Sequence, residues 1–138
     1  MDSQKYLPLI ARTFLGGLFF QSGIRKILGF AATQQELTEA GIPLAAGVTL
    51  FMIVVELIGG ASILLGYRVQ IGVILVLLYL VPSTLIFHNP LVDSSQMIEF
   101  MKNLAIVGGL LMFTAYGPGS VSLERRFSTT RNPQYSEE

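Results

Sequence analysis

One acidic residue stands inside an otherwise apolar segment of the sequence. Glu56 lies near the middle of residues 44–66, which are long enough to cross a bilayer and contain no other ionisable side chain. An ionised carboxylate at that depth costs at least about 2.5–3.5 kcal/mol, so Glu56 needs a cationic partner or stays protonated. Such a group can carry protons or hold a ligand cation, and it can equally be one half of an ion pair that fixes helix register.

Lys102 is the partner that we predict for Glu56, because its long side chain can reach inward over the difference in depth between them. Arg12 approaches Glu56 from the other side of the bilayer and is the alternative partner. The predicted polar pocket lies in the membrane half away from both termini and has five members: Lys26, Glu56, His88, Lys102 and Asn103. Four further polar residues are secondary candidates: Arg12, Arg25, Gln21 and Thr84.

His88 is the only histidine, and the sequence has no cysteine. Its imidazole could exchange protons near neutral pH, or it could cap a helix at the membrane surface. Thiol redox chemistry, thiolate metal sites and multi-histidine metal sites are excluded, and no metal is expected. The sequence has no nucleophile–base pair and no phosphate-binding glycine loop, so whether the protein is an enzyme stays open.

The composition indicates what kind of protein holds these groups. Hydrophobic residues make up 51% of the 138 residues, and mean hydropathy is +0.60. Charged residues make up 13%, about half the share of a soluble domain. The nine basic residues only balance the nine acidic ones, which excludes a nucleic-acid partner. These values favour a small integral membrane protein.

Four segments have the length and apolarity of membrane-spanning helices: residues 6–28, 44–66, 69–88 and 95–116. Residues 71–81 are apolar all round, whereas a helix of a soluble bundle has a polar face. The connections are short, so neighbouring helices should be antiparallel. The sequence therefore predicts an all-α fold, a transmembrane antiparallel four-helix bundle that forms one domain over residues 1–124.

Two of the segments outside these spans carry predictions of their own. Residues 29–43 form the longest loop, where a capping-box pattern at Thr33–Glu36 predicts a short helix at the membrane interface. Residues 125–138 are polar, and we expect them to form a frayed tail. Six cations fall on the side of the termini and three on the other, so the positive-inside rule places both termini in the cytoplasm.

Paired glycines occur in three of the four spans, in the half near the termini or close to the middle. Small residues let membrane helices approach closely. We predict that six glycines pack the helices together: Gly16, Gly17, Gly59, Gly60, Gly108 and Gly109. The bundle should then be closed on the side of the termini and widen toward the polar pocket.

Five blocks of the sequence, in order, resemble the DoxX family of small membrane proteins: Ser22–Lys26, Glu56–Gly66, Leu85–His88, Lys102–Met112 and Tyr116–Glu124. The resemblance implies a four-helix bundle in a bacterial cytoplasmic membrane, or in another internal energy-transducing membrane. It also implies a quinone-linked redox setting, because the family is named after a subunit similar to those of thiosulfate:quinone oxidoreductases. The five predicted pocket residues match polar positions of the family, to which no accepted catalytic role is attached.

Two functions follow as hypotheses. The protein could be an accessory subunit associated with a larger membrane redox complex or its assembly. Alternatively, it could handle a quinone or another small molecule in the polar pocket, with a quinone or a lipid as the bound molecule. The expected partners are membrane lipids and either a larger complex or further copies of the chain. A transporter is a weaker hypothesis, because four spans without an internal repeat leave little room for alternating access.

Overall fold

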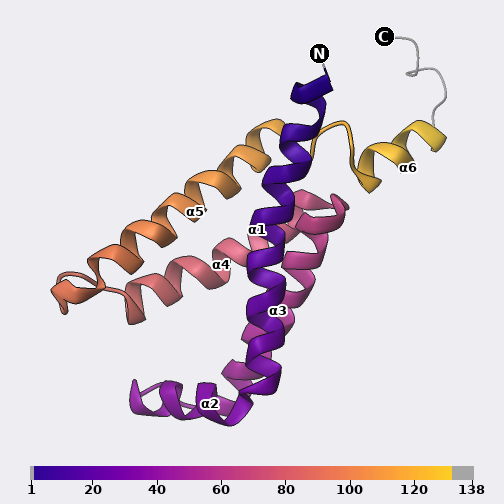
Figure 1. Ribbon diagram of the computed structural model, residues 1–138. Helices are drawn as coiled ribbons and strands as arrows, with labels where there is room; N and C mark the ends of the chain where they lie inside the picture. Colours follow the sequence, from indigo (N-terminus) through magenta and orange to yellow (C-terminus); the bar gives the residue numbers. More distant parts are fainter. Residues whose placement is uncertain (1, 132–138) are drawn as a thin grey trace.

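The computed structural model describes residues 2–131, and over that range the chain has helices and no strands (Figure 1). The helices are α1 (Asp2–Leu28), α2 (Phe30–Glu39), α3 (Ala45–Leu65), α4 (Val69–Phe87), α5 (Met97–Tyr116) and α6 (Leu123–Arg131), and a 3-10 turn at Ser94–Gln96 precedes α5. Within the described residues, α1, α3, α4 and α5 with its preceding turn are long and apolar enough to span a membrane. The predicted all-α fold with four spanning helices is confirmed.

The turn between α3 and α4 makes these two helices antiparallel. Gly66 ends α3 with φ +67°, a left-handed conformation that glycine adopts without a side-chain clash. The Ser62 hydroxyl donates to the carbonyl oxygens of Tyr67 and Arg68, at 2.6 and 3.1 Å. These bonds satisfy backbone groups that would otherwise be left unpaired at the helix ends.

Glycines bring α1 and α3 into backbone contact. A Cβ atom at Gly16 would lie 2.7 Å from the Leu64 nitrogen, and one at Gly60 would lie 2.6 Å from the Phe20 nitrogen. On another face of α3, a Cβ at Gly59 would lie 2.6 Å from a methyl group of Val76 on α4. Gly59 and Gly60 therefore serve different neighbours, because adjacent helical residues point about 100° apart.

Three of the six glycines do not make the close contacts that the sequence suggested. Cβ atoms at Gly17 and Gly108 would have no neighbouring atom within 4 Å in the described chain, and one at Gly109 would only approach the Leu15 side chain, at 3.3 Å. Gly17 points away from α3 because it follows Gly16 directly. Gly108 and Gly109 lie on α5, which packs mainly on α4 and barely touches α1.

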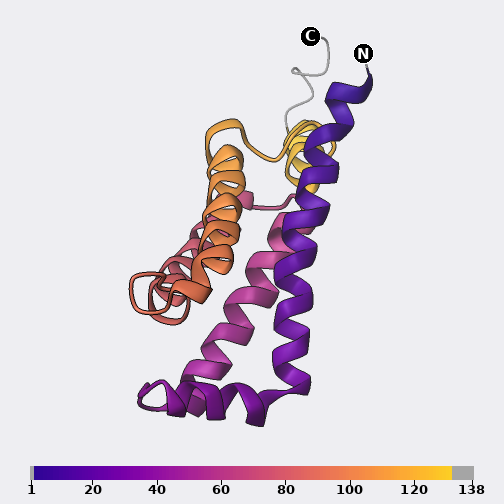
Figure 2. The same cartoon turned by 60° about the vertical axis from the view of Figure 1, so that its left-hand side comes forward.

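The helices form a bundle that opens toward one end. In Figures 1 and 2, α1 and α3 run side by side, whereas α4 and α5 lean away from them with increasing distance from α6. We call the two ends of the molecule the α6 end and the α2 end. The main core lies where the spanning helices are closest and includes Ile63, Val73, Val76 and Leu110.

Helix α2 lies across the open end of the bundle (Figure 2). Its Leu37 is 2% exposed and packs with Ala45 and Met52 of α3, beside the half-buried side chains of Tyr79 and Phe87 from α4. A short helix in this loop is present as predicted. It begins at Phe30 rather than at a Thr33 cap, because the Thr33 amide already bonds the Gly29 carbonyl within the helix.

The segment after α5 is more ordered than the sequence suggested. Residues 125–131, expected to fray, belong to α6. The Ser122 hydroxyl accepts a hydrogen bond from the Arg125 amide at 3.2 Å, and the Glu124 amide donates to the Gly66 carbonyl at 3.0 Å. These bonds cap the start of α6 and attach it to the α3–α4 turn. The remainder of the predicted tail, residues 132–138, lies outside the described residues.

Candidate functional site

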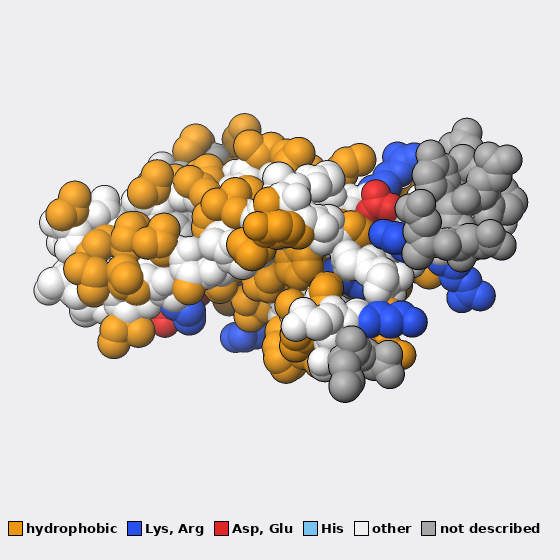
Figure 3. Space-filling view, turned by 90° about the horizontal axis from the view of Figure 1, so that it is seen from above, with side chains coloured by type: hydrophobic (Ala, Val, Ile, Leu, Met, Phe, Trp, Pro, Cys, Tyr) orange, Lys and Arg blue, Asp and Glu red, His pale blue; other side chains and the backbone are white. Residues whose placement is uncertain are grey.

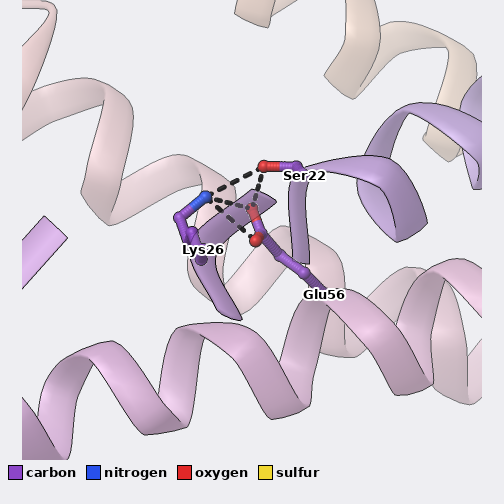
Figure 4. A network of polar contacts seen from close by, with 3 residues as sticks. All are labelled: Ser22, Lys26 and Glu56. Carbon is purple, nitrogen blue, oxygen red and sulfur yellow. Dashed lines mark hydrogen bonds and ion pairs between the residues drawn. The ribbon is translucent and has the colours of Figure 1, made fainter. Parts of the chain in front are cut away.

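A buried ion pair joins α1 and α3 on the side of the α2 end. The Lys26 ammonium lies 3.0 Å from both carboxylate oxygens of Glu56 (Figure 4). Ser22 completes the network: its hydroxyl accepts a hydrogen bond from Lys26 at 2.9 Å and donates one to Glu56 at 3.0 Å. The Glu56 side chain is 2% exposed, so its carboxylate is stabilised by these partners and by the nearby Tyr79 hydroxyl, and not by water.

The geometry of α1 explains why Lys26 is the partner. Ser22 and Lys26 are four residues apart and therefore share one face of the helix. Helical side chains lean toward the N-terminus, so the long Lys26 side chain reaches back over Ser22 to the carboxylate on α3. The contact between Gly16 and Gly60 holds α1 and α3 close enough for this to happen.

The predicted partnership of Glu56 with Lys102 is wrong. Lys102 pairs with Glu99 at 2.6 Å, one turn away on α5, and its side chain is 58% exposed. The prediction rests on depth along the membrane normal, and depth does not determine which helices are neighbours in the bundle. Helix α5 packs on α4, so Lys102 is not brought to the face of α3 that carries Glu56.

Arg12, the alternative partner, also does not meet Glu56. It is 1% exposed and lies toward the α6 end, where its guanidinium donates to the carbonyls of Ile63 and Leu64 at 3.2 and 3.1 Å and to that of Val121. The first two carbonyls belong to the last turn of α3, where a cation complements both unpaired acceptors and the helix dipole. The secondary assignment of Arg12 to the polar pocket is therefore wrong.

A cavity of about 680 Å³ opens at the α2 end, between α1, α2, α3 and α4. Lys26 stands at its edge with its side chain 17% exposed, while Glu56 is sealed behind it. Polar residues and apolar residues both line the cavity, the apolar ones including Leu37, Met52 and Phe87. Such a mixture suits a ligand with a polar head and an apolar body.

His88 lies on the cavity wall, at the end of α4. Its Nδ1 atom is 2.8 Å from the amide oxygen of Gln96 in the turn before α5. An amide oxygen can only accept, so Nδ1 carries the hydrogen, and Nε2 is an acceptor in the neutral ring and a donor in the charged one. The bond orients the ring and leaves Nε2 for another partner.

The other predicted members divide between the cavity and places outside it. Arg25 is exposed and lines the cavity, whereas Gln21 is exposed outside its lining. The Asn103 amide donates to the Thr84 hydroxyl at 3.0 Å, on the α4–α5 side. These two line a separate small cavity of about 140 Å³ between α4 and α5. Of the five main candidates, the structure brings together Lys26, Glu56 and His88 and leaves out Lys102 and Asn103.

Sequence reasoning missed Ser22 and Tyr79 as site residues, and it did not single out Ser83 as a candidate. The Lys26 ammonium lies 5.7 Å from the centre of the Tyr79 ring, a cation–π distance, and both Tyr79 and Ser83 line the cavity. A signal was available, because Ser22 with Lys26 and Tyr79 with Ser83 are each four residues apart on a helix. Both pairs form a polar stripe on an otherwise apolar span.

The described residues contain no group of three His, Cys, Asp or Glu side chains that could hold a metal ion. The chemistry that the cavity offers is hydrogen bonding and proton exchange. Lys26, Tyr79 and Ser83 carry donors on its walls, and His88 can donate or accept a proton.

The fold and the cavity define a small helical membrane protein with a polar site between its spanning helices. Residues 7–89 match the sequence profile of a family described as DoxX. The chain is 34% identical over 118 residues to the Inner membrane protein YqjF of Escherichia coli (strain K12). The aligned region covers 85% of this chain and 88% of that protein. It is 30% identical over 125 residues to the Inner membrane protein YphA of the same organism, covering 87% and 89%. No solved structure matches the chain. The chain belongs to the DoxX family.

Proposed function

We propose that this membrane protein binds a small apolar molecule with an uncharged polar head, of the quinone class, in the cavity at the α2 end. The observation that carries the proposal is the ion pair at the cavity edge. Lys26 faces the cavity with its charge neutralised by Glu56. The other charged residues of the lining are one cation, Arg25, and two acidic residues, Glu36 and Glu39, so the site offers donors without a net positive charge. A quinone headgroup has two carbonyl acceptors and no charge, which fits that environment.

The residues around the cavity have distinct tasks in this proposal. Ser83 donates a hydrogen bond to one carbonyl oxygen, and the apolar side chains of Met52 and Phe87 contact the ring. The three N–H groups of Lys26 are taken by Ser22 and Glu56, so its ammonium polarises the headgroup without donating to it. His88 supplies or takes a proton at Nε2, since Nδ1 is held by Gln96. Glu56 does not touch the ligand: it positions Lys26.

The test measures binding of a short-chain ubiquinone analogue to the purified protein in detergent by native mass spectrometry. We expect Ser83→Ala and His88→Ala each to weaken binding about fivefold, the value of one hydrogen bond of about 1 kcal/mol. Gln21→Ala and Lys102→Ala are matched controls, because both residues lie outside the cavity lining. Absence of binding to the wild type, or equal losses in the controls, would contradict the proposal.

A role as an accessory subunit is the second proposal, and α5 favours it. Only Leu110 and Phe113 of this helix are buried, so most of its apolar surface is open to lipid or to a membrane partner. A photo-crosslinking residue at Leu111, which is 51% exposed, should capture a stoichiometric larger protein or a second copy. The same photo-crosslinking residue in place of Ile24 on α1 is the control. Absence of capture at both positions would indicate a protein without a membrane partner and would contradict this second proposal.

We also propose that the α6 end faces the cytoplasm of a bacterial cell. The bias of basic residues toward that end supports this orientation. The chain lacks cysteine, so single cysteines can report each end. A membrane-impermeant maleimide applied to intact spheroplasts should label Gln35→Cys on α2 and not Ser128→Cys on α6, and the reverse pattern would invert the orientation.

A further inference from the structure

A second cavity, of about 750 Å³, opens at the α6 end of the molecule. It lies between the start of α1, the end of α3 and the segment that leads into α6. Its lining has four cationic side chains and no acidic one: Lys5, Arg12, Arg125 and Arg126. Figure 3 views the molecule from this end and shows Lys and Arg side chains gathered on the side of α6, while apolar side chains cover the opposite side.

Arg12 gives this cavity a buried positive charge that no carboxylate neutralises. The residue is 1% exposed, and its three hydrogen bonds all go to backbone carbonyls. Its Nε atom is buried without a hydrogen-bond partner. In the described chain the ion pairs within 4 Å are Lys26–Glu56 and Lys102–Glu99, so Arg12 has none. Carbonyl dipoles share its charge but do not cancel it.

One acidic residue lies close by and has to be considered. Glu124 precedes Arg125 on α6, and its Oε2 atom is buried without a hydrogen-bond partner. Its backbone is attached to Gly66 on the α3–α4 turn, and it does not line the cavity. Glu124 therefore reduces the positive potential at this end without occupying the place of an anion inside the cavity.

We propose that this cavity binds a phosphate group, carried by the head of an anionic phospholipid or by free phosphate. Guanidinium groups match phosphate oxygens in charge and geometry, and the hydroxyl group of Ser120 adds a donor to the lining. Basic pockets between spanning helices near a membrane surface suit anionic lipid heads. The half-buried side chains of Leu9 and Leu64 form an apolar side to the cavity, which suits the glycerol and acyl portion of a lipid.

The test titrates the purified protein in detergent with dioctanoyl phosphatidylglycerol, dioctanoyl phosphatidylcholine and inorganic phosphate, and measures bound ligand by native mass spectrometry. The key variant is Lys5→Gln/Arg126→Gln, because both side chains are exposed and their loss should not disturb the fold. Each cation contributes about 1 kcal/mol to binding an anionic head, so the double variant should bind phosphatidylglycerol about 25-fold more weakly. Arg68→Gln, a cation at the same end outside the cavity lining, should bind as the wild type does.

The outcomes separate the two sources of phosphate. Tight binding of phosphatidylglycerol, with weak binding of inorganic phosphate, supports a lipid site. Binding of inorganic phosphate without binding of either lipid supports a free-phosphate site. In both cases the loss must follow Lys5 and Arg126 and not Arg68. Equal binding of phosphatidylcholine and phosphatidylglycerol without binding of inorganic phosphate, or equal ligand binding by the double variant and the Arg68 control, overturns the proposal.

Discussion

The two ends of the molecule each hold a buried cation, and they neutralise it differently. At the α2 end, the Lys26 ammonium is paired with the Glu56 carboxylate and with Ser22. At the α6 end, the Arg12 guanidinium meets only backbone carbonyls from α3 and from the segment before α6. Burial alone therefore does not set the electrostatic potential of a site. How much of the cation's positive potential remains depends on whether its partner carries a negative charge.

The two proposals give each cavity a different class of ligand. A neutralised cation offers hydrogen-bond donors with little net charge, which favours an uncharged head such as a quinone carbonyl. A cation held only by dipoles keeps its positive field, which favours an anion. Two cavities of similar size, about 680 and 750 Å³, are thus expected to select different molecules.

Removing Lys26 should have the largest effect on stability. The variant Lys26→Met leaves the Glu56 carboxylate buried without its cation, and breaking a buried pair in this way costs about 3–5 kcal/mol. Unfolding by SDS titration in detergent micelles should show this loss. The exposed pair of Lys102 and Glu99 provides the matched control, since Lys102→Met should cost less than about 1 kcal/mol.

A second substitution tests whether the charge is the cause. In Lys26→Met/Glu56→Gln the buried carboxylate is gone, and the new amide can still accept a hydrogen bond from Ser22. We expect this double variant to recover most of the stability lost by Lys26→Met. If it is as unstable as the single variant, the pair matters through packing and the contrast with Arg12 is weakened.

Removing Arg12 should cost less, about 2–3 kcal/mol, because it breaks charge-assisted hydrogen bonds without stranding a paired carboxylate. The variant is Arg12→Met, measured by the same SDS titration. Arg12→Lys should recover only part of the lost stability, since an ammonium group cannot bridge the carbonyls of α3 and Val121 as the guanidinium fork does. Adding Glu124→Gln to Arg12→Met should restore little, unlike the double variant at the other end, and a full recovery would reveal a hidden pair.

Much of the fold could be predicted from the sequence because membrane spans depend on composition over about 20 residues. Glu56 could also be identified, since one carboxylate in an apolar segment needs an explanation by itself. Its partner could not be. The choice between Lys26 and Lys102 depends on which helices lie side by side, and that follows from the glycine contacts of α1 with α3 and from the lean of α5 toward α4.

Local patterns failed where tertiary contacts decide. The Thr33–Glu36 pattern resembles a cap, but α2 starts at Phe30 because only Gly29 separates it from α1. The polar residues after Ser122 resemble a tail, but a backbone bond to Gly66 attaches the start of α6 to the bundle. In both cases a neighbouring element supplies what the local sequence does not show.

The glycine contacts give a smaller effect that sharpens the comparison of the two ends. Gly60→Ala would place a methyl group 2.6 Å from the Phe20 nitrogen and force α1 away from α3. We expect a loss of about 1–3 kcal/mol in the free energy of unfolding measured by SDS titration. The distance between the Lys26 ammonium and the Glu56 carboxylate should also increase. Gly17→Ala is the control, because its methyl group would meet no atom within 4 Å, and equal losses in both variants would contradict the observed helix crossing.

The smallest effect concerns Asp93, which starts the turn before α5. The Ser95 hydroxyl and amide both donate to its carboxylate and hold the pKa of Asp93 below its usual value. Because the folded pKa is the lower one, the cap contributes its full stabilisation above the ordinary aspartate pKa of about 3.9 and loses it as the pH falls through the lowered value. Asp93→Asn keeps an acceptor that does not titrate. The measurement is the hydrogen-exchange rate of the Ser95 amide in the wild type divided by that in the variant, and this ratio should rise only in acid. A ratio that stays constant from neutral pH down to a pH of about 3 or lower would show that Asp93 does not hold this turn through its charge.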